Sequence, residues 1–450
     1  MNDKAMAGAD ELPWLAASLD ETEVMRTGEA MHRLLSRLFP ICRSITGPGV
    51  RETLAQLTEV VPLSITEIPT GTPVFDWTVP REWSIEEAYI EHEGGKRYVD
   101  FRDSALHVVG YSTPVDQWTS LEELLPRLHS LPQHPDWVPF RTSYYKEDWG
   151  FCLSEKVRQS LPAGRYHVVI NSRLYDGSLT IGEHLHAGES DDEVLVFAHT
   201  CHPSLANDNL SGIVVAAWLA AFLGGRSTRF SYRFVFAPAT IGSIAWMAHN
   251  EPGLHRIRHG IVLAMLGDDG PLRYQRTCGG NAIIDRAAAA VLRSRYPGSQ
   301  LLDFSPWGFD ERQFNSAGIR LPVGRLTRAL PGHYPPEHTS ADMPAAVSPA
   351  ALGEAWRACL RIFDVLECDR RYINLAPKGE PQLGRRGIYR QAGGHYDGVP
   401  ERQLALLWLL NQCDGSKSLL DVAEHSGLDI QLVAHCALEL QQAGLLEPAL

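Results

Sequence analysis

The sequence predicts an α/β protein with a mixed, mostly parallel sheet and helices on both of its faces. A small β-rich insert and a C-terminal winged-helix-like domain are expected beside it. Between about residues 151 and 365, short apolar runs typical of buried strands alternate with longer runs typical of helices. Residues 61–150 instead carry alternating, aromatic-rich pieces separated by proline and glycine. Residues 401–443 carry three short helical patterns.

Composition and charge narrow the class of protein. The chain of 450 residues is 44% hydrophobic and 21% charged, as is usual for a globular protein of two or three domains. A net charge of -13 disfavours nucleic acid and anionic membranes as partners. The eight cysteines form no CxxC pair, and residues 1–6 lack the order of a signal peptide. No apolar run approaches the roughly 20 residues of a membrane span. These features predict a cytoplasmic protein without disulfides or membrane contact.

The first 150 residues are expected to contribute to two different domains. Residues 20–60 show helical spacing with one break at residues 44–49. This helical pair is assigned to the α/β domain together with residues 151–367. Residues 61–150 form the predicted insert, whose aromatic residues are most simply core material. An alternative is that the insert covers a neighbouring cleft, with residues 141–145 as its lining.

The α/β domain is expected to alternate strands and helices. The expected strands are residues 166–170, 194–198, 232–237 and 260–264. The expected helices are residues 213–223, 244–250, 283–294 and 348–366.

The C-terminal domain is assigned to residues 368–450 and begins with a linker-like stretch that includes Gly393 and Gly394. Helices are expected at residues 401–412, 419–426 and 430–443, with Ser416 and Asp429 as caps. Residues 401–450 contain only two cations, Arg402 and Lys417. Because phosphate contacts supply much of the affinity for DNA, a transcription factor is disfavoured. The domain is predicted to mediate protein contacts or oligomerisation.

The loop after the strand at residues 194–198 holds the strongest candidate site. Sites in open α/β sheets lie beyond the carboxyl ends of strands. His202 and Asp208 offer the nitrogen and oxygen ligands that zinc accepts. His199 is either a further ligand or a residue that hydrogen-bonds the loop, and Cys201 is either a thiolate ligand or a small buried residue.

A further ligand is expected from a polar loop near residue 340. His338 is the best candidate, His333 is weaker, and Asp342 can orient the His338 imidazole by accepting its other N–H.

Two further pairs of charged residues each have two alternative roles. Asp310 and Glu311 form either a receptor for a substrate ammonium group or a solvated helix start. Arg325 and Arg328 pair either with a substrate carboxylate or with those two acids.

Sequence pieces spread over nearly the whole chain resemble a known family. In chain order they are Arg43-Ser-Ile-Thr-Gly47, Phe75-Asp-Trp-Thr-Val-Pro80, Thr142-Ser-Tyr-Tyr145, Cys201-His-Pro-Ser204, Asn207-Asp-Asn-Leu-Ser-Gly212, Thr240-Ile-Gly-Ser243, Asp310-Glu-Arg-Gln-Phe314 and His338-Thr-Ser-Ala-Asp342. With them the chain resembles a bacterial aminopeptidase-like family that has an inserted β domain and a C-terminal winged helix. More loosely, it is similar to the zinc-aminopeptidase superfamily, which also contains glutamate carboxypeptidase-like enzymes.

The resemblance implies a zinc-aminopeptidase-like fold with one or two zinc ions. It implies Asp208 as a metal-bridging carboxylate, His202 or His199 as one zinc ligand and His338 as another. Apart from the resemblance, Tyr145 is the expected substrate contact if residues 141–145 line a cleft.

The chain departs from the implied pattern at its acidic positions. The family pattern Pro-Glu-Thr-Ile-Gly-Ser places a general-base glutamate where this chain has Ala239, and a second superfamily glutamate falls on Thr240. An alanine cannot accept a proton, and loss of a general base costs about 10²–10⁴-fold in rate. Ala264 occupies the position of a superfamily ligand aspartate, for which Asp268 or Asp269 is the expected substitute.

These observations predict a zinc-dependent, aminopeptidase-type hydrolase of an amide bond beside a free amine. The expected substrate is a peptide or an aminoacylated small molecule. Ala239 predicts an impaired chain, through either an engineered replacement that traps a ligand or a natural loss. The alternative is a catalytically inactive binding or scaffolding relative that uses the same cleft.

Overall fold

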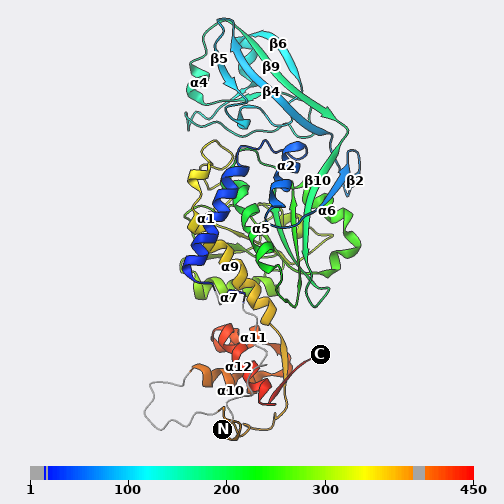
Figure 1. Ribbon diagram of the computed structural model, residues 1–450, viewed down its shortest axis with the longest axis vertical. Coiled ribbons are helices and arrows are strands. Elements are labelled where there is room, and N and C mark those ends of the chain that lie inside the picture. Colours follow the sequence, from blue (N-terminus) through cyan, green and yellow to red (C-terminus); the bar gives the residue numbers. More distant parts are fainter. Residues whose placement is uncertain (1–14, 17–18, 389–400, 450) are drawn as a thin grey trace. The chain divides into compact units, whose positions relative to one another are not determined.

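The computed structural model describes residues 15, 16, 19–388 and 401–449 (Figure 1). Residues 1–6 and the linker glycines Gly393 and Gly394, on which two expectations rest, lie outside the described residues. The chain divides into two compact units. The larger unit comprises Leu19–Ala282 and Gly298–Arg357, and the smaller takes its described residues from Met1–Ser18, Ile283–Pro297 and Ala358–Leu450.

An eight-stranded mixed sheet forms the core of the larger unit, in the order β1-β10-β12-β11-β13-β16-β14-β15. Its strands are β1 (Ser64–Pro69), β10 (Ser178–His186), β11 (Glu193–His199), β12 (Ser231–Ala237), β13 (Ile257–Leu263), β14 (Arg273–Gln275), β15 (Gln300–Leu302) and β16 (Val323–Thr327). The four central strands β12, β11, β13 and β16 run parallel. The predicted mixed, mostly parallel sheet is therefore confirmed.

Helices cover this sheet close to the positions that periodicity predicts. They are α1 (Glu21–Leu38), α2 (Pro48–Leu57), α5 (Gly212–Leu223), α6 (Ile241–His249), the short α8 (Glu311–Phe314) and the first part of α9 (Pro349–Cys368). All of β11 is buried, as expected for a strand covered on both faces. Leu195 and Phe197 of β11 pack with Ile244 and Trp246 of α6 in one core cluster. This packing fixes the carboxyl end of β11, where His199 stands.

One helical stretch, Ala206–Leu223, has the length and apolar composition of a membrane-spanning helix. Within the fold 83% of this stretch is buried, and its α5 portion contacts the central strands β10 to β13. In the structure it is a core helix.

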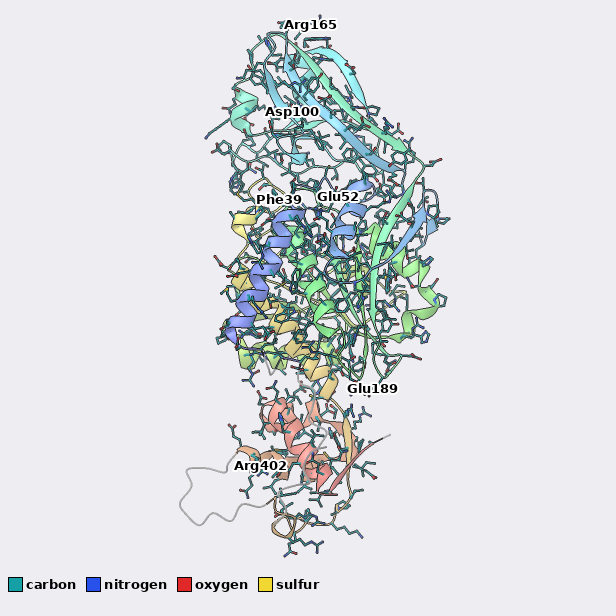
Figure 2. The ribbon with its side chains drawn as sticks, in the orientation of Figure 1. Phe39, Glu52, Asp100, Arg165, Glu189 and Arg402 are labelled. Carbon is teal, nitrogen blue, oxygen red and sulfur yellow. The ribbon has the colours of Figure 1, made fainter. Side chains whose placement is uncertain are left out.

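The β-rich insert is built on a four-stranded antiparallel sheet in the order β5-β4-β9-β6 (Figure 1). Its strands are β4 (Glu82–His92), β5 (Arg97–Asp100), β6 (Val115–Ser120) and β9 (Arg165–Tyr175). Figure 2 labels Asp100 and Arg165 at its strand ends. The remaining short elements of this region are β2 (Pro73–Val74), β3 (Trp77–Thr78), α3 (Leu121–Leu124), β7 (Leu128–His129), β8 (Phe151–Cys152) and α4 (Glu155–Gln159).

The predicted limits of the insert, residues 61 and 150, are wrong at both ends. β1 pairs with β10 in the eight-stranded sheet, whereas the strand predicted at residues 166–170 is part of β9 and pairs with β4. Alternating burial of Tyr166, Val168 and Ile170 suits any half-covered sheet. The partner of such a strand is decided by long-range pairing, which the local pattern does not contain.

The smaller unit contains the three predicted C-terminal helices and a three-stranded sheet in the order β18-β17-β19. Its elements are α7 (Ile283–Arg295), the end of α9, β17 (Arg371–Asn374), α10 (Glu401–Gln412), β18 (Asp414–Ser418), α11 (Leu419–Ser426), α12 (Ile430–Gln442) and β19 (Leu446–Pro448). Asp429 caps α12 as predicted. Ser416 lies in β18, and Ser418 caps α11 in its place through a reciprocal bond pair with Asp421.

Arginine side chains form ion pairs with acidic residues of α12 and its cap. Arg402, labelled in Figure 2, pairs with Glu439 of α12. Within the same unit, Arg295 of α7 pairs with Asp429 at the start of α12. In helix-turn-helix proteins the N-terminal part of this helix reaches the bases. Here that part begins with a carboxylate already paired with an arginine, and the absence of nucleic-acid partners stays a prediction.

The buried carboxyl of Asp364 in the smaller unit predicts a pH-dependent stability. Its side chain accepts the N–H groups of Leu15 and Ala16 and is 1% exposed, and burial raises its pKa to about 7. Between about pH 4 and 7 the folded chain therefore keeps a proton that the unfolded chain has lost. The free energy of unfolding falls as pH rises over this window, by up to about 1.4 kcal/mol per pH unit.

Asp364→Asn is expected to flatten that part of the curve of unfolding free energy against pH, measured in urea. Asp303→Asn, at a carboxylate that is 90% exposed, is the control and should leave the slope unchanged. Equal slopes for the chain and Asp364→Asn would contradict the assignment.

Candidate metal site

Asp208 lies at the centre of the candidate site. It follows β11 in the turn Ala206–Ser211 that leads into α5, and its side chain is fully buried. Its backbone N–H and that of Asn207 both donate to the carboxylate of Asp342, at 2.9 and 2.7 Å. Asp342 therefore holds the Asp208 turn, and the prediction that it accepts an N–H of His338 is wrong. Burial, reinforced by the nearby Asp208 charge, raises the pKa of Asp342 to about 7.

Three histidines surround the two carboxylate oxygens of Asp208. His199 Nε2 and His202 Nδ1 lie 2.9 and 3.8 Å from Oδ1. His338 Nε2 lies 3.0 Å from Oδ2. Burial raises the pKa of Asp208, but the histidines lower it by more, so that the carboxylate is held ionised.

His199 is oriented as a hydrogen-bond donor to Asp208. The side-chain amide of Asn209 is fixed because its Oδ1 accepts from Met265 N–H and its Nδ2 donates to the carbonyl of Leu263. The same Nδ2 lies 3.2 Å from His199 Nδ1, which must then accept. The proton of the neutral ring is on Nε2 and points to Asp208. Metal ligation through Nε2 would place the proton on Nδ1, against the Asn209 donor.

His202 has the properties of a metal ligand. Burial, with added repulsion from the other histidines, lowers its pKa to about 3, so the ring is neutral at pH 7. The buried Arg43 donates to the His202 carbonyl at 2.8 Å, which explains why the piece Arg43-Ser-Ile-Thr-Gly47 accompanies the metal loop. Cys201 is 3% exposed and burial raises its thiol pKa to about 12, so it is a small buried residue and not a thiolate.

The insert holds His338 from the other side. The Phe140 N–H donates to the His338 carbonyl at 2.8 Å, and Pro139 and Thr339 form an isolated bridge. The Phe140 ring packs edge-on against both His202 and His338, with ring centroids 5.4 and 5.5 Å apart. The insert thus contacts the loop of His338 and the ring of His202, whereas the alternative that it covers a cleft lined by residues 141–145 stays a prediction.

The residues fit a zinc ion. Two ligands at 2.0–2.1 Å in a tetrahedral shell are about 3.3 Å apart, close to the spacings around Asp208. Asp208 Oδ2 is buried and has no partner in hydrogen-bond geometry, although His338 is near it. A buried carboxylate oxygen without a hydrogen bond is costly unless a cation completes it.

Neither Asp268 nor Asp269 takes the place of the acidic residues that the resemblance implies. Ala239 is half-buried, and its N–H lies 3.3 Å from Cys201 Sγ. Asp268 accepts from the Asn207 amide and from Gly270 N–H, so it braces the loops. In the described part of the chain, neither Asp268 nor the exposed Asp269 belongs to a group of closely spaced ligand atoms.

Asp310 and Glu311 are both buried, so the expected solvated helix start is wrong. Asp310 accepts from Thr240 N–H and Ser243 Oγ, and burial raises its pKa. Its second oxygen is buried and has no hydrogen-bond partner. Glu311 forms an ion pair with Arg325. Of the two alternatives for Arg325, a substrate carboxylate or a neighbouring acid, the structure shows the second.

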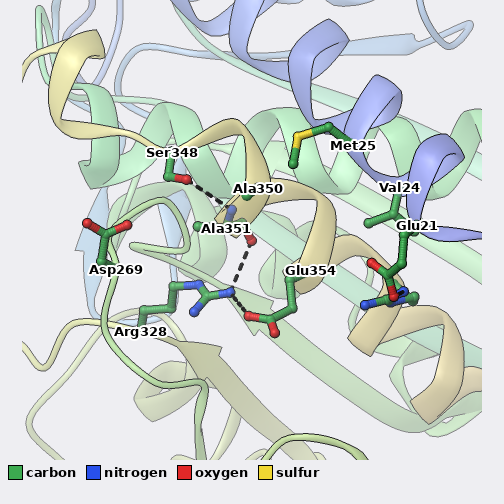
Figure 3. A pocket seen from close by; sticks show the side chains of 10 residues that line it. Glu21, Val24, Met25, Asp269, Arg328, Ser348, Ala350, Ala351 and Glu354 are labelled. Atoms are coloured by element: carbon green, nitrogen blue, oxygen red, sulfur yellow. Dashed lines mark hydrogen bonds and ion pairs between the residues drawn. The ribbon is translucent and has the colours of Figure 1, made fainter.

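Arg328 lies elsewhere in the larger unit, on a pocket of about 320 Å³ that Asp269 also lines (Figure 3). Its guanidinium pairs with Glu354 and donates to the carbonyls of Leu266 and Ala351. None of the side chains around Asp208 lines this pocket.

An exposed pair of aromatic rings follows the segment that holds His338. Tyr144 is half-buried, with the Cys201 thiol among the groups close enough to affect its pKa, and its ring packs edge-on against Tyr111. The next residue, Tyr145, is 52% exposed and lies 5.3 Å from the ring of Trp77, which is 38% exposed. The predicted substrate contact Tyr145 thus forms an exposed aromatic pair with Trp77, and its role toward a substrate stays a prediction.

Sequence reasoning missed Glu337, Phe140 and Asn209. The potential metal-ligand atoms of Asp208, Glu337 and His338 all lie within 4.8 Å of one another. The same holds for those of His199, His202 and Asp208. The only local signal for Glu337 was its place directly before His338. His333, the weaker candidate, belongs to neither group.

Comparisons with known proteins identify the family. Residues 32–369 match the profile of "Domain of unknown function (DUF4910)". The chain belongs to the DUF4910 family. Residues 370–448 match a winged helix-turn-helix profile, so the C-terminal domain of this DUF4910 chain is a winged helix.

Proteins of Clostridium acetobutylicum resemble this chain over nearly its whole length. The DUF4910 chain is 46% identical over 421 residues to a Clostridium acetobutylicum protein named "Putative polysaccharide biosynthesis protein with aminopeptidase-like domain", covering 94% of this chain and 96% of that protein. The crystal structure of a "putative peptidase" from C. acetobutylicum superposes with a TM-score of 0.90 at 43% identity, covering 95% and 98% of the two chains.

More distant structures show the fold alone. A zinc aminopeptidase from Bacillus subtilis superposes with a TM-score of 0.55 at 14% identity, covering 78% of this chain and 95% of that one. The DUF4910 domain therefore has the zinc-aminopeptidase-like fold that the resemblance implied.

Proposed function

We propose that this DUF4910 chain is a zinc-dependent hydrolase of aminopeptidase type whose turnover is limited by Ala239. The observation that carries the proposal is the buried Asp208 carboxylate, with His202 near one oxygen and His338 near the other. Zinc at this position supplies polarisation of a substrate carbonyl and a coordinated water with a pKa of about 7. The fold, which resembles that of a zinc aminopeptidase, and the aminopeptidase-like domain in the name of the C. acetobutylicum relative support this proposal.

Other residues of the chain hold the proposed ligands in position. Asp342 and Arg43 fix the loop that carries Asp208 and His202, and the Phe140 ring packs edge-on against the imidazoles of His202 and His338. What the site lacks is a proton acceptor at residue 239, where the side chain is a methyl group. We infer a peptide or an aminoacylated small molecule as substrate, and the name of the C. acetobutylicum relative favours a setting in polysaccharide biosynthesis.

The direct test compares amino-acid p-nitroanilides with their N-acetylated counterparts, using the zinc-loaded chain and its Ala239→Glu variant. Hydrolysis that requires a free amine and increases in Ala239→Glu supports the proposal. Tight binding of the free-amine compounds without hydrolysis by either protein would favour the inactive binding relative.

Tyr145→Ala is expected to weaken substrate binding without changing the zinc content. One aromatic contact contributes about 0.5–1.5 kcal/mol, so KM of Ala239→Glu should rise about two- to tenfold when Tyr145 is also replaced. Trp118→Ala is the matched control, because Trp118 is similarly exposed, at 48%, but lies on β6 of the insert sheet. Equal KM changes in both variants would show that Tyr145 does not contact the substrate.

A further inference from the structure

We propose that Glu337 is a metal ligand, which completes a three-residue position with His338 and Asp208 on the Oδ2 side of that carboxylate. This inference rests on the proposed function and goes beyond it, because it identifies a carboxylate that neither the family resemblance nor the relatives assign. Ligand atoms of the three residues lie within 4.8 Å of one another.

The buried Oδ2 of Asp208 is a second observation that points to a cation here. Among the described residues no group bonds it in hydrogen-bond geometry, and its ion-pair partner, His338 Nε2, stands 3.0 Å away. The carboxylate of Glu337 is near enough to complete the same shell. Two carboxylates and one imidazole are a ligand set that zinc accepts, with a fourth position left for substrate or water.

The loop around Glu337 holds one of its oxygens in place. Gly332 N–H donates to Glu337 Oε2 at 2.6 Å, and the adjacent His338 carbonyl is tied to Phe140 N–H. Among the described residues no arginine or lysine forms a salt bridge with Glu337, in contrast to Glu311, which pairs with Arg325. An anchored carboxylate next to a ligand histidine compensates for the acidic ligands missing at Thr240 and Ala264.

The test measures zinc affinity by chelator competition, and cobalt absorption spectra, for the full chain and three variants. Glu337→Gln keeps the shape and an oxygen for Gly332 N–H but loses the charge, so its zinc affinity should fall at least about tenfold and its cobalt bands should shift. Glu337→Ala should lose as much or more. His333→Ala, a matched change in the same loop, should bind like the unaltered chain.

Three results would overturn the inference or its basis in distinguishable ways. Affinity and spectra of Glu337→Gln equal to those of the unaltered chain would show that Glu337 only braces the loop, and would leave the proposed function standing. Equal losses in Glu337→Gln and His333→Ala would also reject Glu337 as a specific ligand. An unaltered chain that binds neither zinc nor cobalt would reject both proposals.

Discussion

Replacing Ala239 by glutamate is expected to raise the rate of hydrolysis of a free-amine amide by about 10²–10⁴-fold, the usual contribution of a general base. Residue 239 lies two positions after the end of β12, and its N–H contacts Cys201, the neighbour of His202. A glutamate there stands beside the metal loop and accepts the proton that the attacking water loses. The rate is measured with amino-acid p-nitroanilides at saturating zinc.

Ala239→Gln is the matched control for this prediction. Glutamine has the size and polarity of glutamate but accepts no proton at neutral pH, so its rate should stay near that of the unaltered chain. A zinc-loaded Ala239→Glu protein that is no faster than Ala239→Gln would contradict the hydrolase account and favour the inactive binding relative.

Local pattern was sufficient to predict the central part of the fold. The strand at residues 194–198 and the helix at residues 213–223 differ from β11 and α5 by one residue at each end or less. Both are fully or almost fully buried, and long apolar runs identify such elements well. The strands at the sheet edge, such as β14 and β15, are three residues long and were not predicted, because so short a segment carries no period.

The candidate ligands His202, Asp208 and His338 were predicted from the sequence, whereas the contacts that hold them in place were not. His202 and Asp208 are six positions apart on one turn, and their ligand chemistry is visible in the sequence. Asp342 was expected to bond His338 but accepts two backbone N–H groups instead. Backbone donors have no sequence signature, so such a partner cannot be inferred from residue types. Whether the Glu337 carboxylate lies near Asp208 depends on how its loop folds, which residue types do not show.

The second large effect is expected from Asp208→Asn, which should abolish stable zinc binding. Asparagine preserves the size of the side chain but removes the charge near His202 and His338. His338→Ala should also lose most of its zinc, since it removes the group nearest to Oδ2. His199→Gln is the comparison variant: because His199 donates to Asp208, its replacement should cost less zinc than that of His338. Equal losses in these two would show that His199 is a ligand.

The measurement that tests the central claim most directly is the zinc content per chain after dialysis against a zinc buffer, for the unaltered protein and for Asp208→Asn. The account predicts at least one tightly held zinc in the unaltered protein and none in Asp208→Asn, with both proteins folded by circular dichroism. An unaltered chain free of zinc, or an Asp208→Asn variant that retains it, would contradict a metal site built on Asp208.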